Sequence, residues 1–373
     1  PSKNTAVVVA DPSNGEILGM ASYPTFNLND PRKLTGMYTD EEIKDMSDEE
    51  YRNNLYSLWT NYCVSESYEP GSTFKPVTVA SALEEGVVKD GDTYVCKGFE
   101  TVADYKLKCH VFSTIGSHGS LTVEQALMNS CNPYMIHLAL EMGNSRFAYY
   151  QSLFGFGKIT GIDLPGETTG IVYGDRMTTI DAACNSFGQT INVNMMQMMA
   201  AYCSIINGGM LYQPHIVKRI ESANGEVVKE YKANLVRQTI TASTSKLLRR
   251  YLKNTVEEGT AKKAGVTGYS VAGKTGTAQK GDRKDNKWII SFIGHAPAEN
   301  PKFAIYVVID EPYGTTGTSG SSADVLTLTH NILEKLLPYM NVYKDASDEY
   351  EDTSSSPDEL TVDGIPAGTA SSN

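Results

Sequence analysis

The chain is organised around one stretch, Glu69-Pro70-Gly71-Ser72-Thr73-Phe74-Lys75-Pro76. Pro70-Gly71 breaks whatever element precedes it, and from Thr73 to Glu85 apolar side chains recur every three or four residues, which predicts a helix. Ser72 should therefore lie at or just inside a helix N-terminus, where free N–H groups and the positive end of the helix dipole favour negative charge. Lys75 is three residues further on, so we expect its amine beside the Ser72 hydroxyl.

A serine hydroxyl is a weak nucleophile until a neighbour takes its proton, and a lysine buried near other cations can be neutral enough to do so. A Ser-x-x-Lys pair also arises by chance, so the pair alone does not identify a catalytic site. Two further motifs follow, Ser130-Cys131-Asn132 and Lys274-Thr275-Gly276-Thr277. Three such motifs in this order are typical of penicillin-binding proteins and class A β-lactamases.

Longer stretches resemble one branch of that group, the transpeptidase domain of class B penicillin-binding proteins, which are monofunctional enzymes of cell-wall synthesis. The resemblance lies in Ala6–Asn29, in the segment from Phe154 to Glu167, and in Ser186-Phe187-Gly188-Gln189. The first of these segments usually has a different sequence in the bifunctional class A enzymes, so it distinguishes the two classes of penicillin-binding protein. The resemblance covers about residues 4–340.

The composition is that of a globular protein, with 373 residues, 40% hydrophobic and 20% charged. The net charge of −12 argues against nucleic acid as a partner. Residues 344–373 are acidic and rich in Ser and Gly, so we predict a folded domain over 1–343 followed by a disordered tail or linker. No apolar run is long enough to span a membrane, and the chain begins at Pro1 rather than Met, which indicates a fragment of a longer protein.

Strand and helix patterns predict an α+β fold, an antiparallel five-stranded sheet flanked by helices with an inserted, mostly helical subdomain. This order agrees with the fold that the resemblance implies. The elements that define it are a hairpin of Thr5–Ala10 and Glu16–Ser22, the long insertion, strands in Ser270–Lys280, Trp288–Gly294 and Phe303–Asp310, and a last helix over Ser322–Leu337.

The resemblance also implies a role for each motif residue. Ser72 would attack a carbonyl, and Lys75 would take its proton. Ser130 would pass that proton to the leaving amine. Asn132 would hold Lys75 and the amide of a peptide substrate, because its side chain both donates and accepts. The spacing by itself supports only the pairing of Ser72 with Lys75.

The third motif would line the other side of the site. Lys274 would add a second cation, which lowers the pKa of Lys75 and attracts an anionic substrate. Thr275 and Thr277 would offer hydroxyls to a terminal carboxylate, and Gly276 would leave room for a substrate strand. The backbone N–H groups of Ser72 and Thr277 would form the oxyanion hole.

Family members cleave stem peptides ending in D-Ala-D-Ala, hold the acyl group on the serine and pass it to an amine of a neighbouring strand, which cross-links peptidoglycan. β-Lactam antibiotics acylate the same serine. The resemblance implies a membrane-anchored protein with its catalytic domain on the extracytoplasmic face and a glycosyltransferase partner, in division, elongation or sporulation. The chemistry requires no metal or organic cofactor.

Three alternatives share this fold. A β-lactamase would need a deacylating base, for which Glu167 is the candidate, but Leu164-Pro165-Gly166-Glu167 follows the transpeptidase pattern. A D,D-carboxypeptidase would use water in place of the acceptor amine. A β-lactam-sensing receptor domain would be acylated and remain so.

The cysteines allow several interpretations, the simplest being six buried free thiols. Cys131 lies inside an active-site motif, and Cys96 and Cys109 bound a predicted hairpin nearby. A disulfide among these three, acting as a redox switch, is one hypothesis. A zinc site formed by these cysteines with His110 or His118 is less favoured, since no Cys-x-x-Cys pair is present. We interpret His137 and His295 as structural.

Overall fold

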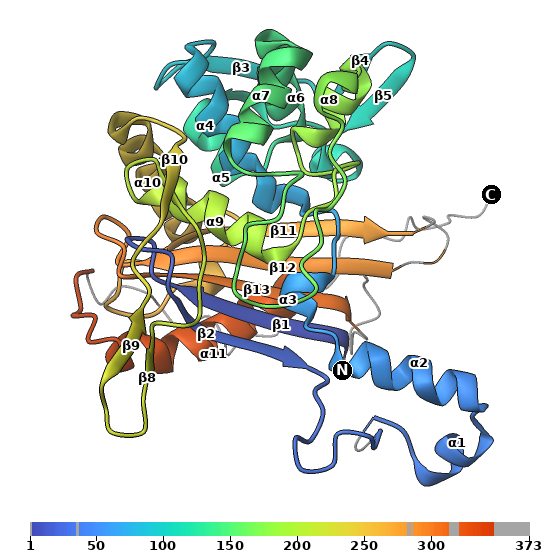
Figure 1. Ribbon diagram of the computed structural model, residues 1–373. Coiled ribbons are helices and arrows are strands. Elements are labelled where there is room, and N and C mark those ends of the chain that lie inside the picture. The colour runs from blue at the N-terminus through green and yellow to red at the C-terminus, as the bar shows by residue number, and fades with distance from the viewer. Residues whose placement is uncertain (1, 35–36, 282–284, 286, 313–320, 347–373) are drawn as a thin grey trace, which may run out of the picture.

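The computed structural model describes residues 2–34, 37–281, 285, 287–312 and 321–346. Its centre is an antiparallel five-stranded sheet of order β11-β12-β13-β1-β2 (Figure 1). The strands are β1 (Ser2–Ala10), β2 (Ile17–Tyr23), β11 (Ala272–Lys280), β12 (Lys287–Ala296) and β13 (Phe303–Pro312). The N-terminal hairpin therefore joins three strands from the end of the chain, as predicted.

Alternation along the strands gives the sheet two apolar faces, because successive side chains point to opposite sides. On β1, Ala6 and Val8 belong to the core shared with the helical lobe, whereas Val9 belongs to a second core under the C-terminal helix. That helix, α11 (Ala323–Tyr339), packs on β12 and β13 from the far side. The sheet is thus covered on both faces.

The chain between β2 and β11 carries the other helices, most of which form a helical lobe on one face of the sheet, whereas residues 40–59 lie to one side of it (Figure 1). The helices of this part of the chain are α1 (Asp40–Asp45), α2 (Asp48–Trp59), α3 (Tyr62–Ser65), η1 (Gly71–Phe74), α4 (Lys75–Glu85), η2 (His110–Ser113), α5 (Val123–Met128), α6 (Asn132–Met142), α7 (Asn144–Leu153), η3 (Gly174–Arg176), α8 (Thr179–Asn185), α9 (Met195–Ile206), α10 (Ala242–Glu257) and η4 (Lys262–Ala264). Short two-stranded sheets complete it: β3 (Thr93–Cys96) with β6 (Gly119–Thr122), β4 (Phe99–Val102) with β5 (Tyr105–Lys108), β7 (Met210–Tyr212) with β10 (Leu235–Gln238), and β8 (Arg219–Glu221) with β9 (Val227–Glu230).

The segment between α4 and α5 contains the predicted hairpin between Cys96 and Cys109, formed by β4 and β5, together with a second strand pair. The segment contains four strands in all, and Cys96 ends β3, which pairs with β6 rather than with the strand before Cys109. Gly98 redirects the chain after β3 with a φ of +86°, and a Cβ there would lie 2.0 Å from the Gly116 carbonyl oxygen. Only glycine permits this close crossing.

The end of the described chain lies against the domain. The N–H groups of Asp345 and Ala346 donate to the Gly268 carbonyl, at 3.0 and 3.2 Å, and the Asp345 carboxylate accepts from the Ser270 N–H at 2.7 Å. These first residues of the predicted tail therefore contact the folded part, and residues 347–373 lie outside the described residues. Within the described chain, no helix combines the length and the apolar character needed to cross a bilayer.

Candidate active site

The turn that carries Ser72 is built on glycine contacts. Gly71, with a φ of +57°, donates its N–H to the Gly188 carbonyl at 2.9 Å, and a Cβ on Gly188 would lie 2.0 Å from the Gly71 oxygen. The Thr73 hydroxyl closes the turn by donating to the Pro70 carbonyl at 2.7 Å. Ser72 therefore lies in η1, directly before α4 and half-buried, which confirms the predicted helix start.

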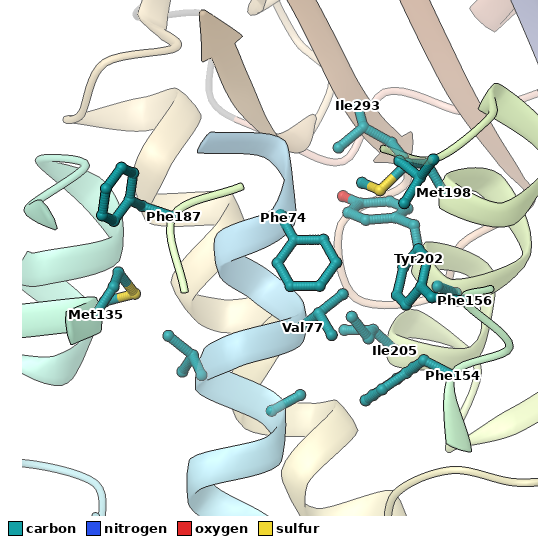
Figure 2. Close-up of a cluster of buried hydrophobic side chains, with 14 of the residues drawn as sticks. Phe74, Val77, Met135, Phe154, Phe156, Phe187, Met198, Tyr202, Ile205 and Ile293 are labelled. Atoms are coloured by element: carbon teal, nitrogen blue, oxygen red, sulfur yellow. The ribbon is translucent and has the colours of Figure 1, made fainter. Parts of the chain in front are cut away.

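Helix α4 is fixed by the apolar core behind this turn. Phe74 is fully buried, with its ring centroid 5.0 Å from that of Phe156. Figure 2 shows Phe74, at the end of η1, and Val77, on α4, projecting towards Tyr202 and the neighbouring side chains of α9. Burying aromatic side chains contributes roughly 1.5–3 kcal/mol each, so the helix that positions Ser72 and Lys75 is firmly held.

Lys75 is wholly buried and makes three hydrogen bonds. Its Nζ donates to the Ser130 carbonyl at 2.6 Å, to the Ser130 Oγ at 3.0 Å and to the Asn132 Oδ1 at 2.7 Å. Burial lowers the pKa of Lys75 to about 8, partly opposed by the nearby Cys109 and Cys131. A lysine in this state holds its proton weakly and can exchange it near neutral pH.

Ser130 connects Lys75 to the nucleophile. Its hydroxyl donates to the Ser72 Oγ at 2.9 Å, so a continuous path runs from Lys75 Nζ through Ser130 Oγ to Ser72 Oγ. The sequence predicted a direct Ser72–Lys75 pair, whereas the hydrogen bonds in the structure run through Ser130. Helix spacing could not reveal this link, because Ser130 comes from a loop 58 residues away.

The loop between α5 and α6 holds Ser130 in an uncommon conformation. Ser130 has a φ of +53°, a value that costs a non-glycine residue free energy and clusters at functional sites. Backbone bonds support it, since Ser130 N–H donates to the Leu127 carbonyl at 3.2 Å and Cys131 N–H to the Ala126 carbonyl at 2.8 Å. We call residues Ser130, Cys131 and Asn132 the helical side of the site.

The residues Lys274–Thr277 on β11 form the sheet side. Lys274 pairs with Ile293 on β12, which belongs to the core shared with the helical lobe, so the lysine faces that lobe. It is wholly buried, and its Nζ donates to the Thr275 carbonyl at 3.3 Å. Burial, followed by the charge of Lys75, lowers its pKa well below the ordinary value. Two buried amines beside each other disfavour having both protonated.

Gly276 lies against the turn that carries Ser72. A Cβ at this position would lie 2.8 Å from the Pro70 carbonyl oxygen and 2.9 Å from Thr73 Cγ2. The turn that carries Ser72 therefore fills the space on the Cβ side of Gly276, and the room for a substrate strand stays a prediction. The glycine allows that turn to pack directly on β11.

The remaining sheet-side residues lie close by. Thr275 is buried, and its hydroxyl donates to the Thr260 hydroxyl at 3.5 Å. Thr277 is half-buried, and a Cβ on Gly71 would lie 2.6 Å from its carbonyl oxygen. The backbones on either side of Ser72 and Thr277 are therefore adjacent, as an oxyanion hole made of both would require.

Glu167, the candidate base of a β-lactamase, is engaged elsewhere. Its carboxylate accepts hydrogen bonds from the Thr160 N–H at 2.7 Å, the Thr160 hydroxyl at 2.6 Å and the Gly161 N–H at 3.0 Å. It fixes the loop after α7. Likewise, buried His295 bonds to the Tyr202 hydroxyl and the Ala298 carbonyl, in agreement with a structural role.

Directly behind the helical side lies a group of cysteines. None of the six cysteines, all of which lie in the described residues, forms a disulfide, so the hypothesis of a disulfide among Cys96, Cys109 and Cys131 is not borne out. Instead, their sulfurs and a ring nitrogen of His118 all lie within 4.8 Å of one another. A hydrogen bond between the Cys109 and Cys131 thiols lowers the pKa of Cys109 and raises that of Cys131.

His110, the other histidine considered from sequence, is not part of this group. Its Nε2 bonds to the Asn129 carbonyl at 2.9 Å, and its ring centroid lies 5.4 Å from that of His118. The set of Cys96, Cys109, His118 and Cys131 was one of several combinations that the sequence allowed. Its spacing, without a Cys-x-x-Cys pair, gave no means of choosing it.

Comparisons with known proteins agree with this geometry. The family "Penicillin binding protein transpeptidase domain" matches residues 5–334. Stage V sporulation protein D of Bacillus subtilis (strain 168) is 39% identical over 341 residues, 90% of this chain and 49% of that protein. The peptidoglycan D,D-transpeptidase FtsI of Escherichia coli (strain K12) is 30% identical over 351 residues, 92% of this chain and 53% of that protein. The chain spans about half the length of these relatives.

Solved structures share the fold. Penicillin binding protein 3 from Mycobacterium tuberculosis, complexed with ampicillin, has a TM-score of 0.78 at 28% identity, with 93% of this chain and 75% of that chain covered. The D,D-transpeptidase domain of a peptidoglycan glycosyltransferase from Eggerthella lenta has a TM-score of 0.77 at 28% identity, with 91% and 79% covered. The similarity includes both the sheet and the helical lobe.

Proposed function

Because the chain belongs to the family of penicillin-binding protein transpeptidase domains, of the class B type, we propose that it is a serine D,D-transpeptidase which cross-links peptidoglycan stem peptides. The observation that carries the proposal is the path from Lys75 Nζ through Ser130 Oγ to Ser72 Oγ. It places a nucleophile, a proton carrier and a buried amine in contact. An acyl transferase needs these three groups together.

The first half-reaction follows from this path. Neutral Lys75 accepts the Ser72 proton, directly or through Ser130, as Ser72 Oγ bonds to the carbonyl carbon of the penultimate D-Ala. The oxyanion is stabilised by the backbone N–H groups of Ser72 and Thr277, an effect worth about 2.7–4 kcal/mol for one donor. Ser130 then protonates the departing amine, and D-Ala leaves as the C–N bond breaks.

In the second half-reaction, the acceptor amine of a neighbouring stem peptide attacks the acyl-enzyme and loses its proton to the same path. Ser72 regains a proton as its ester bond breaks. Lys274 attracts the substrate carboxylate, Thr275 and Thr277 bind it, and Asn132 positions the peptide amide. No step requires a metal or an organic cofactor.

The alternatives differ in what happens to the acyl-enzyme. Fast hydrolysis of a β-lactam would need a base beside the ester, and Glu167 is held by three hydrogen bonds within its own loop. This favours a slowly deacylating enzyme over a β-lactamase. A D,D-carboxypeptidase would release the acyl group to water, and a β-lactam-sensing receptor domain would retain it without turning over peptides.

The setting of the activity is proposed on the resemblance and the named relatives. We infer a domain exposed on the extracytoplasmic face of the cell membrane, anchored by a segment outside this chain, and working beside a glycosyltransferase. Residues 344–373 would serve as a linker that follows the catalytic domain. Because one relative is a stage V sporulation protein, sporulation is the first process to test.

Intact mass after incubation with a penicillin, on the wild type and on Ser72→Ala, tests the proposal. We expect one covalent adduct that persists for hours and is missing from Ser72→Ala. Rapid release of hydrolysed drug would instead support a β-lactamase. No adduct, with or without reductant, would refute the assignment.

A second assay distinguishes a transpeptidase from a D,D-carboxypeptidase and from a receptor domain. The protein is incubated with a synthetic stem peptide ending in D-Ala-D-Ala and an acceptor amine, and products are identified by mass. A cross-linked product supports the proposal. D-Ala release without cross-linking indicates a carboxypeptidase, and no reaction by a protein that still binds penicillin indicates a receptor domain.

A further inference from the structure

The geometry points to a tetrahedral zinc site formed by Cys96, Cys109, His118 and Cys131, which we propose braces the catalytic loop. The four ligand atoms lie within 4.8 Å of one another. Three thiols and one imidazole are a common ligand set of structural zinc. The site lies outside the path used for acyl transfer, so the proposal does not depend on the proposed function.

The distances fit a zinc ion at the centre of the group. Zn–S bonds of about 2.3 Å and Zn–N bonds of about 2.0–2.1 Å in a tetrahedron separate sulfur from nitrogen by about 3.6 Å. The observed distances from His118 Nδ1 are 3.5 Å to Cys109 Sγ and 3.8 Å to Cys96 Sγ. A multi-iron cluster would hold its cysteine sulfurs farther apart, because iron and sulfide ions lie between them.

Backbone N–H groups already point at the sulfurs. Cys96 Sγ accepts from the Gly98 N–H at 3.4 Å. The N–H groups of Asn132 and Val111 lie near Cys109 Sγ, and that of Tyr134 lies near Cys131 Sγ. Such bonds favour thiolate over thiol, and groups surrounding the ligands orient them in metal sites. Apolar packing alone would not require this arrangement of donors.

The position of the group suits a structural metal. Cys96, Cys109 and Cys131 are 1%, 3% and 0% exposed, whereas His118 is half-buried and leaves the group open on one side. The three cysteines come from three different elements. Cys96 ends β3, Cys109 follows the hairpin of β4 and β5, and Cys131 lies in the catalytic loop before α6. Linking separate elements across a long loop is what structural zinc achieves.

The consequence for catalysis is positional. Cys131 lies between Ser130, with its φ of +53°, and Asn132, which holds Lys75. Asn132 also donates from its side chain to the Lys108 carbonyl at 3.3 Å, next to Cys109. A zinc ion bonded to Cys109 and Cys131 would fix both ends of this contact. Cys131 is therefore a positioning residue, and zinc takes no part in the bond-forming steps.

Metal analysis of the whole chain tests the site directly. The protein is purified under reducing conditions from zinc-supplemented medium and dialysed against metal-free buffer, then analysed by elemental mass spectrometry. We expect about one zinc per chain, as a single four-ligand site requires. Metal-free protein with all six thiols titratable, or with a disulfide between two of the three cysteines, would overturn the proposal.

Substitution of the proposed ligands tests where the zinc binds. Cys96→Ser and His118→Asn should lose most of the zinc. The matched controls Cys184→Ser and His110→Asn should retain it, because neither residue belongs to the group. Zinc retained by both ligand variants, or lost equally from the controls, would show that the ion binds elsewhere.

A cobalt titration keeps the test valid if a ligand variant fails to fold. Wild-type protein is stripped with a chelator and titrated with Co²⁺. We expect saturation at about one equivalent, with the intense visible bands of tetrahedral cobalt and a thiolate charge-transfer band, both removed by added Zn²⁺. Weak octahedral bands, or bands unaffected by zinc, would refute a cysteine-ligated site.

Discussion

The two sides of the site hold their polar side chains by different means. On the sheet side, Lys274 and Gly276 lie in a strand whose ladder pairs them with Ile293 and Ser291. On the helical side, Ser130 lies in a loop with a positive φ, outside any ladder. A strand fixes its side chains through repeated backbone bonds, whereas a loop depends on the contacts of its neighbours. The loop side should therefore be the more easily disturbed.

The largest difference should appear between the two buried lysines. Lys75→Met should reduce the rate of acylation by a β-lactam by about 10³-fold, because it removes the proton acceptor. Lys274→Met should cost about 10²-fold, because it removes only electrostatic attraction and stabilisation. Stopped-flow measurements with a fluorescent penicillin would compare them, with thermal unfolding to verify that both variants fold. A larger loss in Lys274→Met would identify that lysine as the base.

The sheet side should be most sensitive where it touches the nucleophile turn. Gly276→Ala introduces a Cβ only 2.8 Å from the Pro70 carbonyl oxygen, so β11 and the turn must separate. We expect the free energy of unfolding to fall by about 1–3 kcal/mol, the usual cost of overpacking, together with slower acylation.

The matched control for this change is Gly19→Ala in β2. There, the nearest contact to a new Cβ is Val9 Cβ at 4.0 Å, so we expect a change within about 0.5 kcal/mol. Urea titrations of both variants would supply the values. Equal losses in the two variants would mean that glycine in a strand, rather than the contact with Pro70, sets the cost.

Removing the proposed zinc should disturb the helical side alone. We expect acylation of the stripped wild type to slow by about tenfold, as for loss of groups that orient a site. In Ser130→Ala, stripping the zinc should reduce the acylation rate little further, because the side chain that the metal positions is already missing. In Lys274→Met the factor of about ten should persist, because the β11 strand rather than the loop holds Lys274, so the two changes should act separately. The same factor in all three proteins would show that the metal acts on overall stability instead.

Local patterns predicted much of this molecule. Ser72 and Lys75 lie within one helical turn, so helical spacing placed them together. Strand β11 is rich in Gly, Ala and Lys, which strands disfavour, so its placement depended on the motif that it carries. The arrangement along the chain, with two central strands before the insertion and three after it, also followed from the strand patterns and the family resemblance. In each case the information needed lies within a few consecutive residues, or in motifs whose order is diagnostic.

Contacts between distant segments were not predictable in the same way. The Ser130–Ser72 hydrogen bond spans 58 residues, and the contact of Gly276 with Pro70 depends on how a turn packs on a strand. The cysteine group depends on the close approach of the chain at Gly98 to the Gly116 carbonyl. The predicted hairpin did not include this contact. Such features depend on tertiary packing, for which the spacing of residues carries little information.

The smallest expected effect concerns the support of the sheet side. His295 pairs with Ala272 at the start of β11, and burial lowers its pKa to about 3. In the unfolded chain an imidazole titrates near its ordinary pKa of about 6.5. Between these values the unfolded state binds the extra proton. The stability is therefore complete above about pH 6.5 and falls as the pH decreases towards 3.

From this difference we expect His295 to remove about 1 kcal/mol of unfolding free energy between about pH 7.5 and 5.5. The measurement is a set of urea titrations across that range on the wild type and on His295→Gln, which cannot take up a proton. The comparison uses slopes with pH, because the substitution also changes the bonds to Tyr202 and Ala298. Equal slopes would mean that His295 is protonated in the folded protein, and that burial beside β11 does not keep it neutral. A steeper dependence of stability on pH in the wild type would show that neutral, buried His295 helps to stabilise the sheet side. The helical side would differ, because its loop is held by the proposed zinc ligands.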